Sequence, residues 1–125
     1  MDKEQTGDGI LENWSVEEVA DALHANRIVL VDIRTPQEYL LESIDGAFLM
    51  PMAVFEAEKL PEDGERPVVL FCGSSKRSER IARHLLEKGR QTARHMTGGF
   101  AAWKKAEKPY RTVDLPSGEV KIENE

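Results

Sequence analysis

Two short runs of the chain are apolar at every position, and they constrain the fold more than any other feature. The first is Ile-Val-Leu-Val at residues 28–31, and the second is Val-Val-Leu-Phe at residues 68–71. A strand with one face in water alternates apolar and polar residues, whereas a strand that is apolar throughout is buried on both faces. Helical patterns follow both runs. The sequence therefore predicts an α/β protein with a mostly parallel sheet.

Helix and strand signals alternate along the rest of the chain. Ser15 and Glu18 are typical of a capping box that starts a helix over residues 16–25. Further helices are expected from residue 36 and over residues 52–59, 77–88 and 100–106, with short strands at 47–49 and 92–96. With 125 residues, the chain is expected to form one domain. We expect a flexible leader at 1–13, the domain at 14–110, and a charged tail or small hairpin at 111–125.

The composition argues against several classes of protein. The chain has 17 Lys and Arg against 23 Asp and Glu, a net charge of −6, so it lacks a basic footprint for nucleic acid. No apolar stretch approaches the roughly 18 residues of a membrane span. The first thirteen residues are acidic and polar, unlike a secretory signal. We therefore expect a cytoplasmic protein that binds neither nucleic acid nor membrane.

The lone cysteine and the scattered histidines exclude two kinds of site. One cysteine cannot form an internal disulfide or a site with several cysteine ligands. His24, His84 and His95 show no ligand spacing. We therefore predict no metal, and we interpret the three histidines as ordinary surface or half-buried residues. Trp14 and Trp103 are interpreted as packing anchors.

The lone cysteine, Cys72, stands between the second apolar run and a helical pattern. Ligands of parallel α/β sheets gather at the carboxyl ends of strands. The N–H groups at a helix start are unpaired and carry partial positive charge, so a loop around that point can cradle an anion. The residues that would form this cradle are Gly73, Ser74, Ser75, Lys76 and Arg77. We expect these groups to lower the pKa of Cys72 and to make the thiolate its reactive form.

Three reaction classes could use such a thiolate. A cysteine phosphatase has five residues between cysteine and arginine, whereas only four separate Cys72 from Arg77, so the cradle is one residue short for phosphate. A monothiol redox protein would use Cys-x-x-Ser, which Cys72 to Ser75 matches, but that reading leaves Lys76 and Arg77 unexplained. In sulfur transfer, the thiolate attacks the outer sulfur of a donor such as thiosulfate and forms a persulfide. The two cations would then attract the anionic donor.

Four segments of the chain, in order, resemble the rhodanese family of sulfurtransferases in its single-domain form. They are LVDIRTPQEY at 30–39, SIDGA at 43–47, CGSSKRS at 72–78 and GGFAAW at 98–103. The resemblance implies a rhodanese-like fold, with a mostly parallel five-stranded sheet flanked by helices on both faces, and no cofactor. It implies that Cys72 carries the persulfide and that Lys76 and Arg77 hold the donor. Many members of the family have glycine where Ser75 stands, and histidine where Ser43 stands.

Together, the loop and the resemblance predict a thiosulfate sulfurtransferase that uses Cys72 as nucleophile. The acceptor would be cyanide or a thiol, including a protein thiol. The substrate-binding residues would be Gly73, Ser74, Ser75, Lys76, Arg77 and Ser78. Asp32 and Arg34 are expected to pair near the site and fix its loops. Two alternatives stay open: a persulfide carrier or non-catalytic binding module, and a cysteine-dependent phosphatase or arsenate reductase, which the loop length disfavours.

Overall fold

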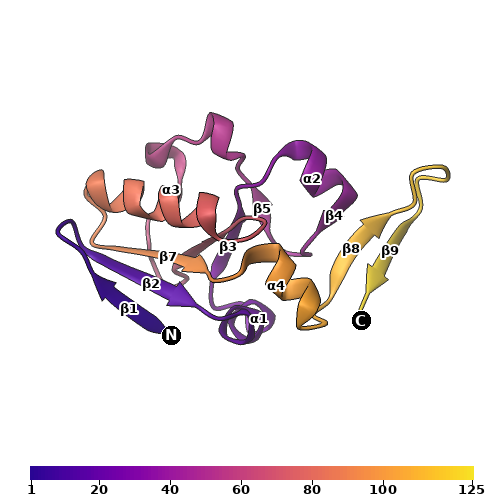
Figure 1. Ribbon diagram of the computed structural model, residues 1–125, viewed down its shortest axis with the longest axis horizontal. Helices are drawn as coiled ribbons and strands as arrows, with labels where there is room; N and C mark the ends of the chain where they lie inside the picture. Colours follow the sequence, from indigo (N-terminus) through magenta and orange to yellow (C-terminus); the bar gives the residue numbers. More distant parts are fainter.

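The computed structural model describes residues 1–125 and has a central sheet with helices on both faces (Figure 1). The sheet order is β1-β2-β7-β6-β3-β5. The strands are β1 (Asp2–Gln5), β2 (Ile10–Trp14), β3 (Val29–Asp32), β5 (Phe48–Leu49), β6 (Val68–Phe71) and β7 (Thr92–Met96). Strands β2, β7, β6, β3 and β5 are parallel, as expected, and β1 adds an antiparallel edge.

Two apolar clusters, one on each face of the sheet, hold the helices. The four helices are α1 (Val16–His24), α2 (Pro36–Leu41), α3 (Lys76–Glu87) and α4 (Gly99–Lys105). Helix α3 packs on one face, whereas α1 and α4 pack on the other, where Trp103 is buried as an anchor and Trp14 is partly buried. Strand β6 serves both faces because its side chains alternate and all of them are buried. None of the helices combines the length and apolarity needed to cross a membrane.

The first thirteen residues differ from the expected flexible leader, because they contribute two strands of the central sheet. Strand β1 pairs antiparallel with β2, and β2 pairs in parallel with β7 from Ile10 opposite Thr92 to Trp14 opposite Met96. All four residues of β1 are exposed, so backbone hydrogen bonds rather than burial hold this strand. A strand without a buried face leaves no apolar pattern in the sequence. This explains why β1 was missed; β2 does have buried residues, but Leu11 and Glu12 are adjacent and do not alternate with exposed ones, so β2 shows no strand pattern either.

One other segment departs from expectation, whereas the C-terminal segment forms the hairpin that was one of its two expected alternatives. The helix expected over 52–59 is two separate 3₁₀ turns, Met52–Val54 and Ala57–Lys59, with extended backbone at Phe55 between them. Phe55 packs against the apolar cluster under α3, which explains the break. At the C-terminal end, β8 (Tyr110–Val113) and β9 (Val120–Glu123) form a hairpin. It joins the two-residue strand β4 (Glu42–Ser43) in a second, three-stranded sheet.

Candidate active site

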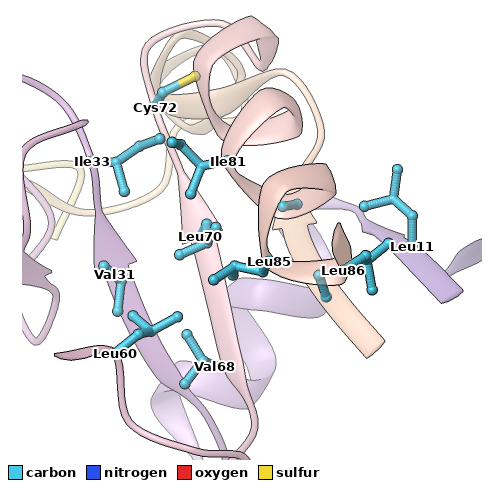
Figure 2. Close-up of a cluster of buried hydrophobic side chains, with 12 residues drawn as sticks. Leu11, Val31, Ile33, Leu60, Val68, Leu70, Cys72, Ile81, Leu85 and Leu86 are labelled. Atoms are coloured by element: carbon cyan, nitrogen blue, oxygen red, sulfur yellow. The ribbon is translucent and has the colours of Figure 1, made fainter. Parts of the chain in front are cut away.

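Cys72 lies directly after β6, at the carboxyl end of a strand in the middle of the sheet. Figure 2 shows its side chain at the end of β6, beside the first turn of α3. Strand β6 has parallel neighbours on both sides, β3 and β7, so the thiol sits where the ends of three strands meet. The side chain has no exposed surface. Sequence and topology therefore bring the cysteine to the edge of the sheet where ligands of parallel α/β proteins bind.

The backbone at the start of α3 donates hydrogen bonds to the sulfur. The N–H groups of Ser75 and Ser78 reach Sγ at 3.2 and 3.3 Å, and the hydroxyl of Ser78 lies 3.6 Å from Sγ. Burial is the largest influence on the pKa of Cys72 and raises it. The hydrogen bonds of Ser78, together with those from the backbone of Ser74 and Ser75, outweigh burial and lower the pKa. The site therefore favours a thiolate, as the sequence predicted.

Helix α4 determines which way the peptide groups of the cysteine loop point. The N–H groups of Phe100 and Ala101 donate to the carbonyl oxygens of Cys72 and Gly73, at 2.8 and 3.0 Å. A trans peptide directs its C=O and N–H to opposite sides, so the N–H groups that follow these carbonyls turn away from α4. Gly99 sits at this contact with φ +60°, and a Cβ there would collide with the Cys72 carbonyl oxygen. Only glycine allows α4 to approach this closely.

Ser75 occupies the N-cap position of α3 in an unusual conformation. Its φ is +113°, and its side chain does not cap the helix. Instead, its hydroxyl accepts a hydrogen bond from the N–H of Gly98. The side chain therefore joins the cysteine loop to the start of α4, while its N–H remains directed at Sγ. Glycine adopts such a φ without steric cost, whereas Ser75 adopts it with its Cβ in place.

Arg77 is held at the mouth of the loop by a carboxylate that the sequence analysis did not single out. Its guanidinium donates to both Glu38 oxygens, at 2.8 and 3.1 Å, and lies against Gly73. These hydrogen bonds are the main reason that the pKa of Glu38 falls to about 2. Lys76 is exposed and makes no ion pair. Arg77 thus faces the loop with its charge already partnered, whereas the charge of Lys76 is free.

Asp32 and Arg34 form the pair expected near the site. Both side chains are buried, and Arg34 donates to the two Asp32 oxygens at 2.8–3.1 Å. Arg34 also donates to the carbonyl of Glu42 at 2.7 Å and lies 4.4 Å from the ring centroid of Phe100. The pair therefore connects the end of β3 to the end of α2 and to α4, the helix that orients the cysteine loop.

A shallow hollow of about 280 Å³ opens beside the cysteine loop. It is lined by Arg34, Glu38, Leu41, Glu42, Gly73, Phe100, Ala101 and Lys104. Lys104 faces the carboxylate of Glu42 at 2.9 Å and also lies near the Phe100 ring. The hollow is therefore bordered by two cations, Arg34 and Lys104, each of which is paired with a carboxylate.

His95, interpreted from the sequence as an ordinary residue, is buried and connected to the cysteine. Its Nδ1 lies 3.0 Å from the Ser78 hydroxyl, and its Nε2 lies 2.6 Å from Oδ1 of Asn13. Burial is the main influence on the pKa of His95 and lowers it. The sequence did contain one sign that His95 is buried, because the alternation of β7 puts it on the same face as Ala93. Its partner Asn13 could not be predicted, because Asn13 lay in the segment expected to be a leader.

Comparisons with known proteins agree with this architecture. A family profile described as Rhodanese-like domain matches residues 15–106. Thiosulfate sulfurtransferase GlpE of Coxiella burnetii is 32% identical over 94 residues, covering 75% of this chain and 82% of that protein. An uncharacterized protein of Synechocystis is 35% identical over 90 residues, covering 71% of this chain, and the chain spans only 50% of that relative.

A solved structure shares the fold. The crystal structure of a rhodanese-related protein from Thermoplasma volcanium superposes with a TM-score of 0.68 at 18% identity. The match covers 79% of this chain and 96% of that chain. At this identity the likeness concerns the fold, and it agrees with the mostly parallel central sheet described above.

Proposed function

The chain belongs to the rhodanese-like domain family, and we propose that it is a thiosulfate sulfurtransferase with Cys72 as its nucleophile. Family membership and the relative named thiosulfate sulfurtransferase support a sulfurtransferase. One observation carries the finer proposal: a buried sulfur at a strand end receives N–H hydrogen bonds from Ser75 and Ser78. Such hydrogen bonds stabilise an anionic sulfur, and both the thiolate and the persulfide of the proposed cycle are anions.

The first half-reaction loads the sulfur. The Cys72 thiolate attacks the outer sulfur of thiosulfate and forms an S–S bond. The S–S bond of thiosulfate breaks, and sulfite leaves with the bonding electrons, so a thiolate and a dianion become a persulfide anion and a dianion. No proton moves in this step if Cys72 is already ionised. The exposed charge of Lys76 attracts the donor, and Arg77 faces it at the mouth of the loop.

The second half-reaction unloads the sulfur. Cyanide or a thiolate attacks the outer sulfur of the persulfide and takes it as thiocyanate or as a new persulfide. The bonding electrons return to Sγ, so Cys72 is again a thiolate. The N–H groups of Ser75 and Ser78 stabilise this leaving thiolate with the same hydrogen bonds that stabilised the nucleophile. Gly73 and Ser74 complete the proposed substrate-binding loop because they leave room close to the backbone.

An intact mass spectrum tests this proposal directly. After incubation with thiosulfate, we expect the purified protein to gain the mass of one sulfur atom and to lose it on addition of cyanide. Because Cys72 is the only cysteine, the Cys72→Ser variant should gain nothing while staying folded. The proposal is contradicted if Cys72→Ser takes up sulfur, or if the wild type takes up none while hydrolysing an aryl phosphate through Cys72.

A further inference from the structure

Ser78 connects the thiol of Cys72 to a buried imidazole. Its Oγ lies 3.6 Å from Sγ on one side and 3.0 Å from Nδ1 of His95 on the other. Ser78 has no exposed surface, and only 1% of His95 is exposed. Neither proposed half-reaction uses this imidazole. A buried titratable group in line with a nucleophile needs a physical account.

Asn13 determines which ring nitrogen of His95 carries the proton. Its Oδ1 can only accept a hydrogen bond, so Nε2, 2.6 Å away, carries the hydrogen. Nδ1 is then unprotonated and presents its lone pair to the hydroxyl of Ser78. Strands β2 and β7 place Asn13 directly opposite His95 in the parallel register. The pairing of the two strands thus keeps the imidazole oriented as an acceptor toward Ser78.

We propose that Ser78 and His95 form a proton relay that removes the proton from the Cys72 thiol. Before transfer, S–H donates to Ser78 Oγ, and the Ser78 O–H donates to Nδ1 of His95. During transfer, the thiol proton moves to Oγ while the hydroxyl proton moves to Nδ1. Afterwards the imidazolium donates to Oγ, and the hydroxyl donates to the thiolate. One proton has moved in total, each hydrogen bond persists with reversed direction, and Asn13 still accepts from Nε2.

The charged residues near His95 affect its protonation in opposite directions. From α3, Glu79 favours the imidazolium, whereas Arg83 disfavours it. Arg83 is itself paired with Glu79 and with Glu4 of β1, so the two influences act in opposite directions from one ion-pair cluster. Burial favours the neutral ring until a nearby anion compensates the positive charge. The Cys72 thiolate supplies that anion, so the proton transfer leaves a pair without net charge inside the protein.

One competing arrangement defines what must be tested. The Ser78 hydroxyl also lies 3.1 Å from the carbonyl of Ser75, to which it can donate instead. In that arrangement, Ser78 only braces the loop, and His95 takes no proton from the thiol. The relay therefore requires His95 to change its protonation together with Cys72, whereas a brace requires no change.

The first test compares two histidine substitutions by following the thiolate. His95→Asn keeps a side-chain oxygen that can accept from Ser78, but it cannot be protonated. His84→Asn is the matched control, because His84 is partly exposed on α3 and makes no side-chain hydrogen bond. The ultraviolet absorbance of the thiolate is recorded against pH, with Cys72→Ser as baseline. We expect His95→Asn to raise the pKa of Cys72 by about one unit, a tenfold smaller thiolate fraction, and His84→Asn to leave it unchanged.

The second test needs no substitution of His95, so it remains decisive if His95→Asn fails to fold. Nitrogen-15 NMR of the imidazole ring reports its tautomer and charge. In the wild type we expect Nδ1 to be protonated at the pH values at which the thiolate first forms, and to lose its proton only at more alkaline pH. In Cys72→Ser we expect the neutral ring with hydrogen on Nε2 over that same range. A neutral His95 throughout the thiolate range, or an unchanged pKa of Cys72 in a folded His95→Asn, overturns the relay.

This inference concerns the same cysteine as the proposed function, but its tests use no sulfur donor. A protein that passes both relay tests yet takes up no sulfur from thiosulfate would contradict the proposed donor and leave the relay standing. A protein that takes up sulfur while His95 stays neutral would contradict the relay and leave the sulfurtransferase standing.

Discussion

Strands β3 and β6 are parallel neighbours, and each ends in a buried ionisable residue followed by a helix, but the two ends are completed differently. After β3, Thr35 caps α2 with a capping box in which Thr35 and Glu38 exchange backbone and side-chain hydrogen bonds. After β6, no side chain caps α3, and the N–H groups of its first turn reach Sγ of Cys72. The N–H groups at the start of α2 are capped by side chains of that helix, whereas those at the start of α3 remain available to the sulfur.

The ionisable residues themselves follow the same contrast. Asp32, at the end of β3, is fully paired with Arg34 from its own segment. Cys72, at the end of β6, has no full opposite charge in hydrogen-bond contact and is stabilised by N–H groups and a hydroxyl. A carboxylate in an ion pair has a fixed partner and stabilises the structure. An anion held only by N–H groups and a hydroxyl can be replaced by another anion, such as a persulfide, at the same position. The difference indicates that β3 supports the site and that β6 presents it.

The largest expected effect comes from disrupting the close contact between α4 and the cysteine loop, which orients the peptide groups before α3. Gly99→Ala puts a methyl group against the carbonyls of Cys72 and Gly73 and should lower the free energy of unfolding by about 3 kcal/mol. It should also reduce sulfur uptake, because the loop carbonyls can no longer face α4. Gly89→Ala is the matched control: its φ is also positive, at +108°, but nothing lies within 4 Å of the added carbon. Chemical denaturation should show a loss of only about 1 kcal/mol for that control, and equal losses would contradict the collision.

A smaller effect is expected from removing the cap at the start of α2. Thr35→Ala deletes the oxygen that accepts from the Glu38 N–H, and should cost about 1 kcal/mol of unfolding free energy. Sulfur uptake measured by mass should remain that of the wild type, because the deleted hydroxyl bonds only the Glu38 backbone and the Glu38 carboxylate that holds Arg77 is kept. Thr35→Ser, which keeps the hydroxyl, should restore the stability. A drop in sulfur uptake without a drop in stability would mean that the two helix starts are not independent.

The smallest effect concerns the ion pair between the two helix starts. Arg77 holds the pKa of Glu38 near 2, below its ordinary value of 4.5, so the folded state favours the carboxylate. The pair's contribution is therefore present above about pH 4.5 and is lost as the pH falls toward 2. Because both side chains are about one third exposed, we expect less than about 1 kcal/mol. Urea unfolding of wild type and Glu38→Gln should differ at neutral pH and converge in acid; a gap that widens in acid would contradict this assignment.

The sequence predicts the fold where burial leaves a pattern. Strands β3 and β6 were found because they are apolar throughout, and the first helix because its capping box is local. Strand β1 could not be found, because its residues are exposed and the partners of its backbone and of Glu4 lie elsewhere in the sequence. The pairing of the two-residue β4 with β8 was equally hidden, because Glu42 and Thr112 meet only in three dimensions. Strands that are defined mainly by backbone pairing therefore cannot be predicted from the pattern of apolar residues.

At the candidate site, the sequence predicts the residues that are consecutive and misses those that are brought together. Cys72 and its loop were identified because a thiol, small residues and cations stand in one short segment. Glu38 and His95 were missed because their partners, Arg77 and Ser78, are 39 and 17 positions away along the chain. Asp32 and Arg34 were interpreted as a pair because they stand two positions apart in the sequence, and the structure contains that pair.

The complete burial of Cys72 also limits the size of the molecules that can react with its sulfur. A thiol without exposed surface is shielded from bulky disulfides and protein thiols, so the resting protein resists oxidative coupling to them. A sulfur atom added to Sγ stands about 2 Å farther out, at the length of an S–S bond. Under the proposed cycle, that added atom, and not Sγ, would be the atom that an acceptor has to reach. The protein would accept its cargo only from small molecules, yet could deliver it to large ones.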